Sequence, residues 1–387
     1  MILLNLDLLN SSNNKLLKIN ILNKYIINKI IHFKKQILLL SLFIIFFCFK
    51  INENLEKIKN KIGNLLFDGK KNNSVLITNI DLNDEFFQLR EVKEQIYKNN
   101  LTYITTISGG AGNVGNSLLM LNNLINICEK IKCRNIIAPF GLKKIIKNPI
   151  IYKKYNITIY PESFINKTKI DILLSVTTPY YFYYRKKRHE MRLSIIREEV
   201  LNNVPKYISY PNDLYINIRS GDIFIDKIHP YYSQPPLCFY QKIINDNNYN
   251  NIYLLSNGHE NPVVDALLKI YPKIIYIHGP VEKDISVLIN AYNLVMPIST
   301  FPLTIITLNN NLKNLYIYEI INYSFQKGNY IIHKMKPSIK YEKIMKRKWK
   351  NTRDQLDLML KEECFNSSLK SYSAKNSIFI FRNEIIY

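Results

Sequence analysis

The sequence predicts an α/β fold in which two facing, doubly wound domains follow an N-terminal membrane anchor. Three observations lead to this expectation. Short apolar runs alternate with helical stretches through the second half of the chain, as they do in mostly parallel sheets. Earlier in the chain, a strand, a Gly-rich turn and an amphipathic helix begin a βαβ unit. An uninterrupted apolar run precedes both regions.

The apolar run occupies residues 36–51 and follows six lysines, at positions 15, 18, 24, 29, 34 and 35. As a helix, Gln36–Phe49 reaches about 21 Å of the roughly 30 Å hydrocarbon core, and a snorkelling Lys50 lets Ile51 extend it. Because lysines precede the run and no small-residue cleavage site follows it, we expect an uncleaved signal-anchor. The tail at 1–35 is then cytosolic, residues 52–100 form a stem, and the rest is lumenal. A buried helix is the alternative.

Composition narrows the class of protein. A chain of 387 residues is long enough for two domains, and 47% hydrophobic residues exclude a disordered polar polymer. The net charge of +23 is scattered along a chain that is also enriched in Asn and Ile, so we expect no nucleic-acid partner. A membrane-tethered nucleic-acid binder stays an alternative on charge alone. The aromatic and basic stretch Pro179–Arg188 is more simply a half-buried strand that runs into a basic turn.

Cysteines and glycosylation sequons are compatible with a lumenal location. Cys48 lies in the anchor, and the four remaining cysteines allow three disulfide pairings, among which the sequence does not choose. Those four are Cys128, Cys133, Cys238 and Cys364. Sequons, which permit glycosylation, begin at Asn72, Asn100, Asn156, Asn166, Asn322 and Asn366.

The first domain is expected at residues 101–205. Its strands are predicted at Tyr103–Ser108 and Asn135–Ala138, with a helix at Ser117–Lys130 between them. The turn before this helix contains the spacing Gly110-x-Gly112-x-x-Gly115. No carboxylate ends the second strand, so a nicotinamide site is not predicted. What remains is a turn that lets a ligand approach backbone N–H groups, or one that only packs the strand tightly on the helix.

The second domain is expected at residues 206–340, after a proline-bounded junction at Pro205–Pro211. Its strands are predicted at Leu214–Ile218, Ile252–Ser256, Ile274–Ile277, Leu294–Pro297 and Leu315–Tyr318. Its helices are predicted at Leu237–Asn245, Pro262–Ile270, Lys283–Tyr292 and Pro302–Leu308. One further helix, Tyr341–Glu362, is expected to pack back across the domains and to begin the last segment, 341–387.

Three strand ends of the second domain carry the candidate site. The buried run Leu214–Ile218 ends at Arg219, and Asp222 follows a Gly turn. Arginine at the edge of a sheet suits a phosphate, although a surface arginine paired with Asp222 has the same pattern. The other two strand ends are polar, and they carry Ser256 and Asn257, and then Ser299, Thr300 and Phe301.

Taken in order, these pieces resemble the fucosyltransferase superfamily, most nearly its α-1,2 members, with kinship to the α-1,6 and protein O-fucosyltransferases. The matching pieces are Gly109–Asn113, Arg219–Asp222, Leu254–Asn257, Asp284–Ala291 and Ser299–Phe301. The resemblance covers about Tyr103 to Glu319. It implies a GT-B fold of two Rossmann-like domains, a GDP-fucose donor, a glycan acceptor and a location in the Golgi or ER membrane.

The resemblance also implies residue roles. Arg219 would hold the pyrophosphate, with Asp222 beside it, and Ser299, Thr300 and Phe301 would bind phosphate and nucleotide. Gly110, Gly112 and Asn113 would reach across the cleft. No Asp-x-Asp triplet occurs, which fits transfer without a metal or other cofactor. The candidates for a general base are Asp222, His229 and Glu260.

One position departs from the family pattern. Asn217 stands two residues before the arginine, where the family often has histidine. Asparagine can form hydrogen bonds but cannot titrate near neutral pH. A non-catalytic relative that binds a sugar nucleotide or a glycan is therefore the alternative to a transferase.

Overall fold

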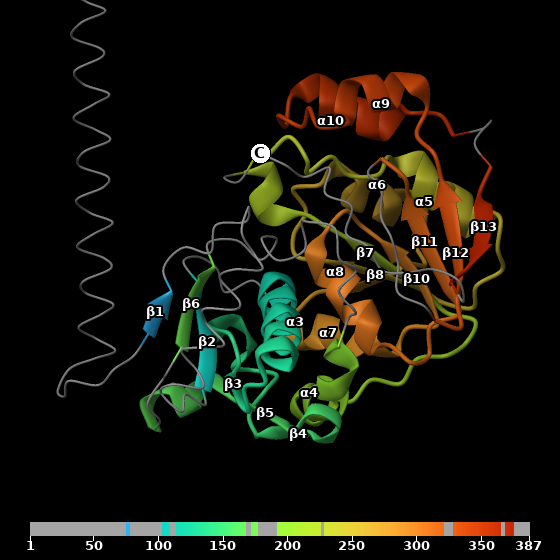
Figure 1. Ribbon diagram of the computed structural model, residues 1–387. Helices are drawn as coiled ribbons and strands as arrows, with labels where there is room; N and C mark the ends of the chain where they lie inside the picture. Colours follow the sequence, from blue (N-terminus) through green and yellow to red (C-terminus); the bar gives the residue numbers. More distant parts are fainter. Residues whose placement is uncertain are drawn as a thin grey trace, which may run out of the picture. The chain divides into compact units, whose positions relative to one another are not determined.

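A computed structural model describes residues 75–77, 103–108, 114–167, 172–176, 192–225, 228–320, 328–364 and 368–374. These residues form two sheets with helices on their faces (Figure 1), which confirms the predicted α/β class. The predicted anchor at 36–51 lies outside the described residues. Among the helices that are described, none is long and apolar enough to cross a membrane.

The first sheet has six strands in the order β1-β6-β2-β3-β5-β4. The strands are β1 (Val75–Ile77), β2 (Tyr103–Ser108), β3 (Asn135–Ile137), β4 (Ile150–Tyr152), β5 (Ile157–Tyr160) and β6 (Ile172–Val176). All neighbours pair in parallel except β4 and β5. β1 falls within the segment predicted as a stem. The predicted strands at 103–108 and 135–138 and the helix between them are confirmed, since α3 spans Val114–Ile131.

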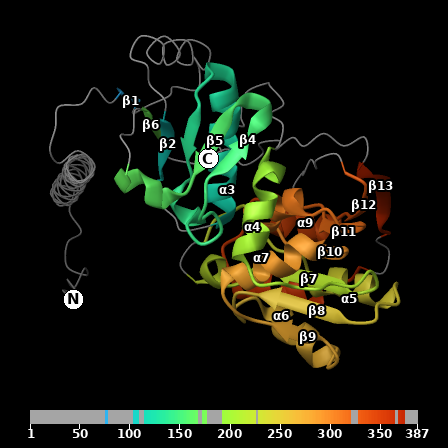
Figure 2. The same cartoon turned by 90° about the horizontal axis from the view of Figure 1, so that it is seen from below.

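The second sheet has seven strands in the order β13-β12-β11-β10-β7-β8-β9. The strands are β7 (Leu214–Ile218), β8 (Ile252–Ser256), β9 (Ile275–Ile277), β10 (Asn293–Met296), β11 (Asn314–Tyr318), β12 (Ile331–Met335) and β13 (Lys370–Ser373). Only β13 is antiparallel. Counted from β7, the parallel strands follow the order 3-2-1-4-5-6, so the winding reverses between β7 and β10. Figure 2 shows β7, β8 and β9 side by side toward one edge.

Both faces of this sheet are covered, because alternate residues of its buried strands point to opposite sides. In β7, Leu214 and Ile216 pack in one core, whereas Tyr215 packs in the other. The first core contains α5 (Leu237–Asn245) and α6 (Pro262–Ile270). The second contains α7 (Val281–Asn290) and α8 (Thr300–Ile305), and it continues into α3 and the short helix α4 (Arg197–Asn203).

The predicted single helix Tyr341–Glu362 is wrong, because two helices occupy this region. They are α9 (Ile339–Met345) and α10 (Arg353–Lys361), drawn beside each other in Figure 1. Between them, Arg347 and Asn351 adopt positive φ angles, which a continuous helix cannot contain. Trp349 is fully buried there and donates its Nε1–H to the carbonyl of Ile223 at 3.1 Å. Burial of this ring therefore favours two short helices over the single helix that the periodicity predicts.

Two disulfides select one of the three pairings that the sequence left open. Cys128 pairs with Cys133 at the end of α3, and Cys238 in α5 pairs with Cys364 beyond α10. The second bond crosses 126 residues and joins the C-terminal helices to the sheet domain. The C-terminal segment, which was predicted to pack back across the domains, is thus linked covalently to the domain of the second sheet.

Candidate functional site

The carboxyl end of β7 supplies the centre of the site. All five residues of β7 are buried, and Arg219 is the first residue beyond the strand. Because the winding reverses between β7 and β10, Arg219 lies at the topological switch point of the sheet. Open α/β sheets bind their ligands in the crevice at this point.

Arg219 is fixed on three sides. Its Nη1 donates to Ser299 Oγ at 3.1 Å, and its Nη2 contacts Asp222 Oδ1 at 2.9 Å. The guanidinium carbon lies 5.8 Å from the ring centroid of Tyr232. Its Nε is buried and has no hydrogen-bond partner within the described part of the chain. A guanidinium held in this way at the switch point of the sheet suits an anionic ligand.

The turn that carries Arg219 is braced from the loop after β8. Glu260 Oε2 accepts from Ser220 Oγ at 2.8 Å and from the Gly221 N–H at 2.9 Å. Asn261 Nδ2 donates to the carbonyl of Arg219 at 3.0 Å. Backbone N–H donors, first that of Glu260 itself, and the Ser220 hydroxyl lower the pKa of Glu260. The lowered pKa favours the ionised carboxylate of Glu260, which stabilises the conformation of the turn.

Gly221 is required by the geometry of the same turn. Its φ is +69°, a conformation that side chains with a Cβ seldom adopt. An added Cβ would lie 2.5 Å from Asn257 Nδ2, and Asn257 Oδ1 already accepts from the Ser220 N–H at 3.0 Å. The amide of Asn257 thus fills the space in which another residue would place its side chain.

A second wall of the site forms where α3 meets α8. Ser299 is the N-cap of α8, and its Oγ accepts from the Phe301 N–H at 3.4 Å. Thr300 Oγ1 and Asn116 Oδ1 are 2.9 Å apart in a hydrogen bond between the two helices. A Cβ on Gly115 would lie 2.6 Å from Phe301 Cα. The glycine therefore allows the start of α3 to close against α8.

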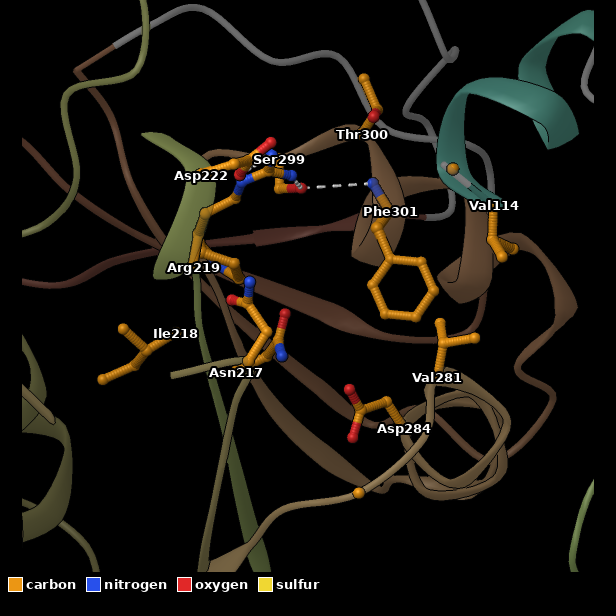
Figure 3. A pocket seen from close by; sticks show the side chains of 14 residues that line it. Val114, Asn217, Ile218, Arg219, Asp222, Val281, Asp284, Ser299, Thr300 and Phe301 are labelled. Atoms are coloured by element: carbon orange, nitrogen blue, oxygen red, sulfur yellow. Dashed lines mark hydrogen bonds and ion pairs between the residues drawn. The ribbon is translucent and has the colours of Figure 1, made fainter. Parts of the chain in front are cut away.

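Asp284, in the first turn of α7, provides a carboxylate in the same pocket. Burial raises its pKa to about 6, although His278 and Lys283 oppose the shift. Within the described residues, no hydrogen bond or ion pair engages this carboxylate. Figure 3 shows Arg219, Asp222 and Ser299 together at one end of the pocket and Asp284 with Val281 at the other.

Arg219, Asp222, Ser299 and Asp284 line a pocket of about 290 Å³. Seven of the residues predicted from the sequence line it, namely Asn217, Arg219, Asp222, Asn257, Ser299, Thr300 and Phe301. Ser256 does not line it; the residue is buried at the end of β8 and donates to the carbonyl of Gly258. The predicted Gly110, Gly112 and Asn113 lie outside the described residues.

Sequence reasoning did not select the other lining residues, which are Val114, Gly115, Ile218, Gly279, Val281, Asp284 and Pro297. The sequence did contain an indication for Asp284, because it is the first residue of Asp284–Ala291, one of the segments that resemble the fucosyltransferases. Among the base candidates, Asp222 is paired with Arg219, and Glu260 braces the turn. His229 stacks on Tyr231 and does not line the pocket.

Comparisons of the whole chain with family models, with curated proteins and with solved structures find no match.

Proposed function

We propose that this protein is a glycosyltransferase with two Rossmann-like domains of the GT-B type, which transfers fucose from GDP-fucose to a glycan hydroxyl. One observation carries the proposal. One pocket at the switch point contains a fixed arginine, Arg219, and a half-buried carboxylate, Asp284, for which the described residues provide no hydrogen-bond or ion-pair partner. A cation at one end and a carboxylate at the other suit a ligand with an anionic group and N–H donors, such as a nucleoside diphosphate.

Arg219 would act on the diphosphate. In the reaction, an acceptor hydroxyl oxygen forms a bond to the anomeric carbon of fucose while the bond from that carbon to the β-phosphate oxygen breaks. GDP leaves with the electron pair, and the hydroxyl proton passes to a base or to water. Arg219 stabilises the charge that develops on the departing diphosphate, with Ser299 and Asp222 holding the guanidinium in place.

Asp284 would read the base. A carboxylate accepts two hydrogen bonds from the N1–H and the 2-amino group of guanine, whereas the matching edge of adenine offers an acceptor in place of N1–H. Val281 and Phe301 line the same pocket and provide apolar surface for a planar ring. This chemistry supports a guanine nucleotide and makes the donor class testable apart from the sugar.

The second candidate is a non-catalytic relative, and Asn217 favours it. Asn217 is buried in the pocket, and its Nδ2 donates to the carbonyl of Leu255 at 3.4 Å. It cannot exchange a proton near neutral pH, as a histidine there would. Such a protein would bind GDP-fucose without releasing GDP.

A type II location in the Golgi or ER membrane stays part of the proposal. The disulfides Cys128–Cys133 and Cys238–Cys364 give weak support to an extracytoplasmic location, where such bonds persist. The sequon residue Asn156 is exposed, as glycosylation requires.

The test is the release of GDP when the full-length chain is incubated with GDP-fucose and a mixed glycan acceptor. Arg219→Ala should lower release by about 100-fold or more, since such donors each contribute this much to transition-state stabilisation. Arg197→Ala is the matched control, because Arg197 is also paired with a carboxylate and its side chain is similarly exposed, 17% against 19%. Equal activity in the two variants would contradict the proposal. GDP binding without release would favour the non-catalytic relative.

A further inference from the structure

Three aromatic side chains form a continuous series that starts at Arg219. The guanidinium of Arg219 lies over Tyr232, and the ring centroid of Tyr232 is 5.4 Å from that of His229. His229 in turn stacks on Tyr231 at 5.5 Å. The guanidinium carbon of Arg347 lies 5.7 Å from the Tyr231 centroid. We call His229, Tyr231 and Tyr232 the aromatic platform.

The loop that carries the aromatic platform is hydrogen-bonded to the C-terminal segment. Its backbone meets the C-terminal segment, where the Trp349 N–H donates to the carbonyl of Pro230 at 3.1 Å. Ser233 Oγ donates to the carbonyl of Met345, and Tyr341 donates to that of Gln234 at 2.7 Å. Hydrogen bonds with the buried residues Tyr341, Met345 and Trp349 therefore fix the backbone that carries the rings.

The rings themselves stay partly exposed. His229, Tyr231 and Tyr232 are each of intermediate exposure, although the residues that follow them, Ser233 and Gln234, are buried. None of the three rings lines the nucleotide pocket. A rigid, half-exposed group of rings beside a pocket resembles a binding surface more than a part of the core, because its position is fixed without being buried.

The position of the aromatic platform next to Arg219 restricts what it can bind. In the reaction above, Arg219 contacts the diphosphate that leaves the anomeric carbon. The attacking hydroxyl must come within about 3–3.5 Å of that carbon before the reaction. The acceptor therefore lies next to Arg219 and outside the nucleotide pocket, which is where the platform begins.

We propose that the aromatic platform is the acceptor subsite and binds a sugar ring of the glycan. The C–H face of a hexose stacks on Tyr231 or Tyr232, and Arg347 at the outer end donates to its hydroxyl groups. This inference rests on the proposed function, because it takes Arg219 as the site of the diphosphate. It adds the class of ligand and the residues that hold it.

The test uses the full-length chain with saturating GDP and four probe sugars, the methyl glycosides of galactose, glucose, mannose and N-acetylglucosamine. Saturation-transfer NMR measures glycoside binding, and calorimetry measures GDP affinity in the same samples. Tyr231→Ala should weaken the bound glycoside by about 5-fold, the usual size of one stacking contact, and leave GDP affinity unchanged. Tyr231→Phe should keep binding, because the ring provides the contact.

Two further variants keep the test decisive. Arg347→Gln, at an exposed residue, should weaken glycoside binding even if Tyr231→Ala folds poorly. Tyr372→Ala is the matched control, because the ring of Tyr372 also has a cation, that of Lys334, 5.6 Å from its centroid, but lies on β13. It should change neither affinity.

The remaining outcomes overturn the inference in distinguishable ways. If no probe binds the wild type in the presence of GDP, or if Tyr231→Ala and Arg347→Gln bind glycosides normally, the platform is not the acceptor subsite. If Tyr231→Ala weakens GDP and not the glycoside, the rings serve the nucleotide. A wild type that binds glycosides but not GDP removes the proposed function and, with it, the acceptor role.

Discussion

Two carboxylates lie near the pocket and are used differently: Glu260 in the loop after β8, which braces the turn after β7, and Asp284 at the start of α7. At the turn, Glu260 accepts hydrogen bonds from Ser220 and Gly221, and its pKa is lowered. At α7, Asp284 has no such partner among the described residues, and burial raises its pKa to about 6. The first carboxylate is satisfied within the chain. The second has no hydrogen-bond partner in the described part of the chain, so a ligand with N–H donors can supply one.

This difference assigns a structural role to Glu260 and a ligand-binding role to Asp284. A carboxylate that accepts backbone and hydroxyl donors stabilises the local conformation, and its removal should act through Arg219. A half-buried carboxylate without a partner has a free-energy cost that a ligand with N–H donors can offset. Four predictions test this distinction, beginning with the one that has the greatest expected consequence.

Gly221→Ala should have the largest effect. The new Cβ meets the Asn257 amide at 2.5 Å in a backbone conformation that disfavours it, so the turn must move. Displacement of a positioned group by about 1 Å can lower a rate by about 100-fold. We therefore expect GDP release to fall by about this factor while the thermal midpoint of unfolding changes little. Normal turnover would show that the turn does not position Arg219.

Asp284→Asn should weaken GDP binding by about 10- to 100-fold, the range expected for hydrogen bonds to a charged acceptor. The wild type should also prefer GDP to inosine diphosphate, which lacks the 2-amino group, and the variant should lose this preference. Calorimetric titration with both nucleotides measures it. Asp265→Asn, in the first turn of α6 and outside the pocket, is the control. A variant with unchanged preference would exclude Asp284 as the residue that reads the base.

The pH dependence of GDP binding should follow Asp284. Guanine donors bind the ionised carboxylate, so affinity should be constant well above the pKa of about 6. Below that pH, GDP must displace a proton, and affinity should fall by about tenfold for each pH unit. Titrations between about pH 8 and about pH 5 test this, and Asp284→Asn should lose the acidic fall. An equal fall in the variant would assign it to another group.

Glu260→Gln should have the smallest effect. The amide keeps one oxygen that can accept from Ser220 or Gly221, but the charge is lost. We expect GDP release to fall by about 3- to 10-fold, within the range of one ordinary hydrogen bond. Glu260→Ala should fall further, and this order of Glu, Gln and Ala is the diagnostic result. If Gln were as inactive as Ala, the carboxylate would be acting in the chemistry rather than in the turn.

The sequence predicted the second sheet well near its centre, where β7 is fully buried and the last three residues of β8 are buried. β7 and β8 have the predicted bounds, because each is a short apolar run that ends in polar residues. The edge strand β13 and its neighbour β12 were not predicted. All four residues of β13 are exposed, and the burial of β12 is irregular, so neither has an apolar pattern.

The candidate site was predicted in part for a similar reason. Residues at strand ends, such as Arg219 and Ser299, were selected because parallel strands bring their carboxyl ends to one edge. Asp284 lies in the first turn of α7, which connects β9 to β10. These two strands lie on opposite sides of β7 in the sheet, so the connection brings Asp284 to the pocket, and the sequence alone does not show this strand order. Likewise, the sequence leaves Glu260 among the candidate bases, because it does not show that Oε2 accepts from Ser220 and Gly221.

The most direct test of the central claim is the affinity of the full-length chain for GDP, GMP and guanosine, measured for the wild type, Arg219→Ala and Asp284→Asn. If Arg219 holds the diphosphate, the preference for GDP over guanosine should be large in the wild type and in Asp284→Asn. It should collapse in Arg219→Ala. A preference that survives the loss of Arg219 would contradict the account, because the diphosphate would then be bound elsewhere.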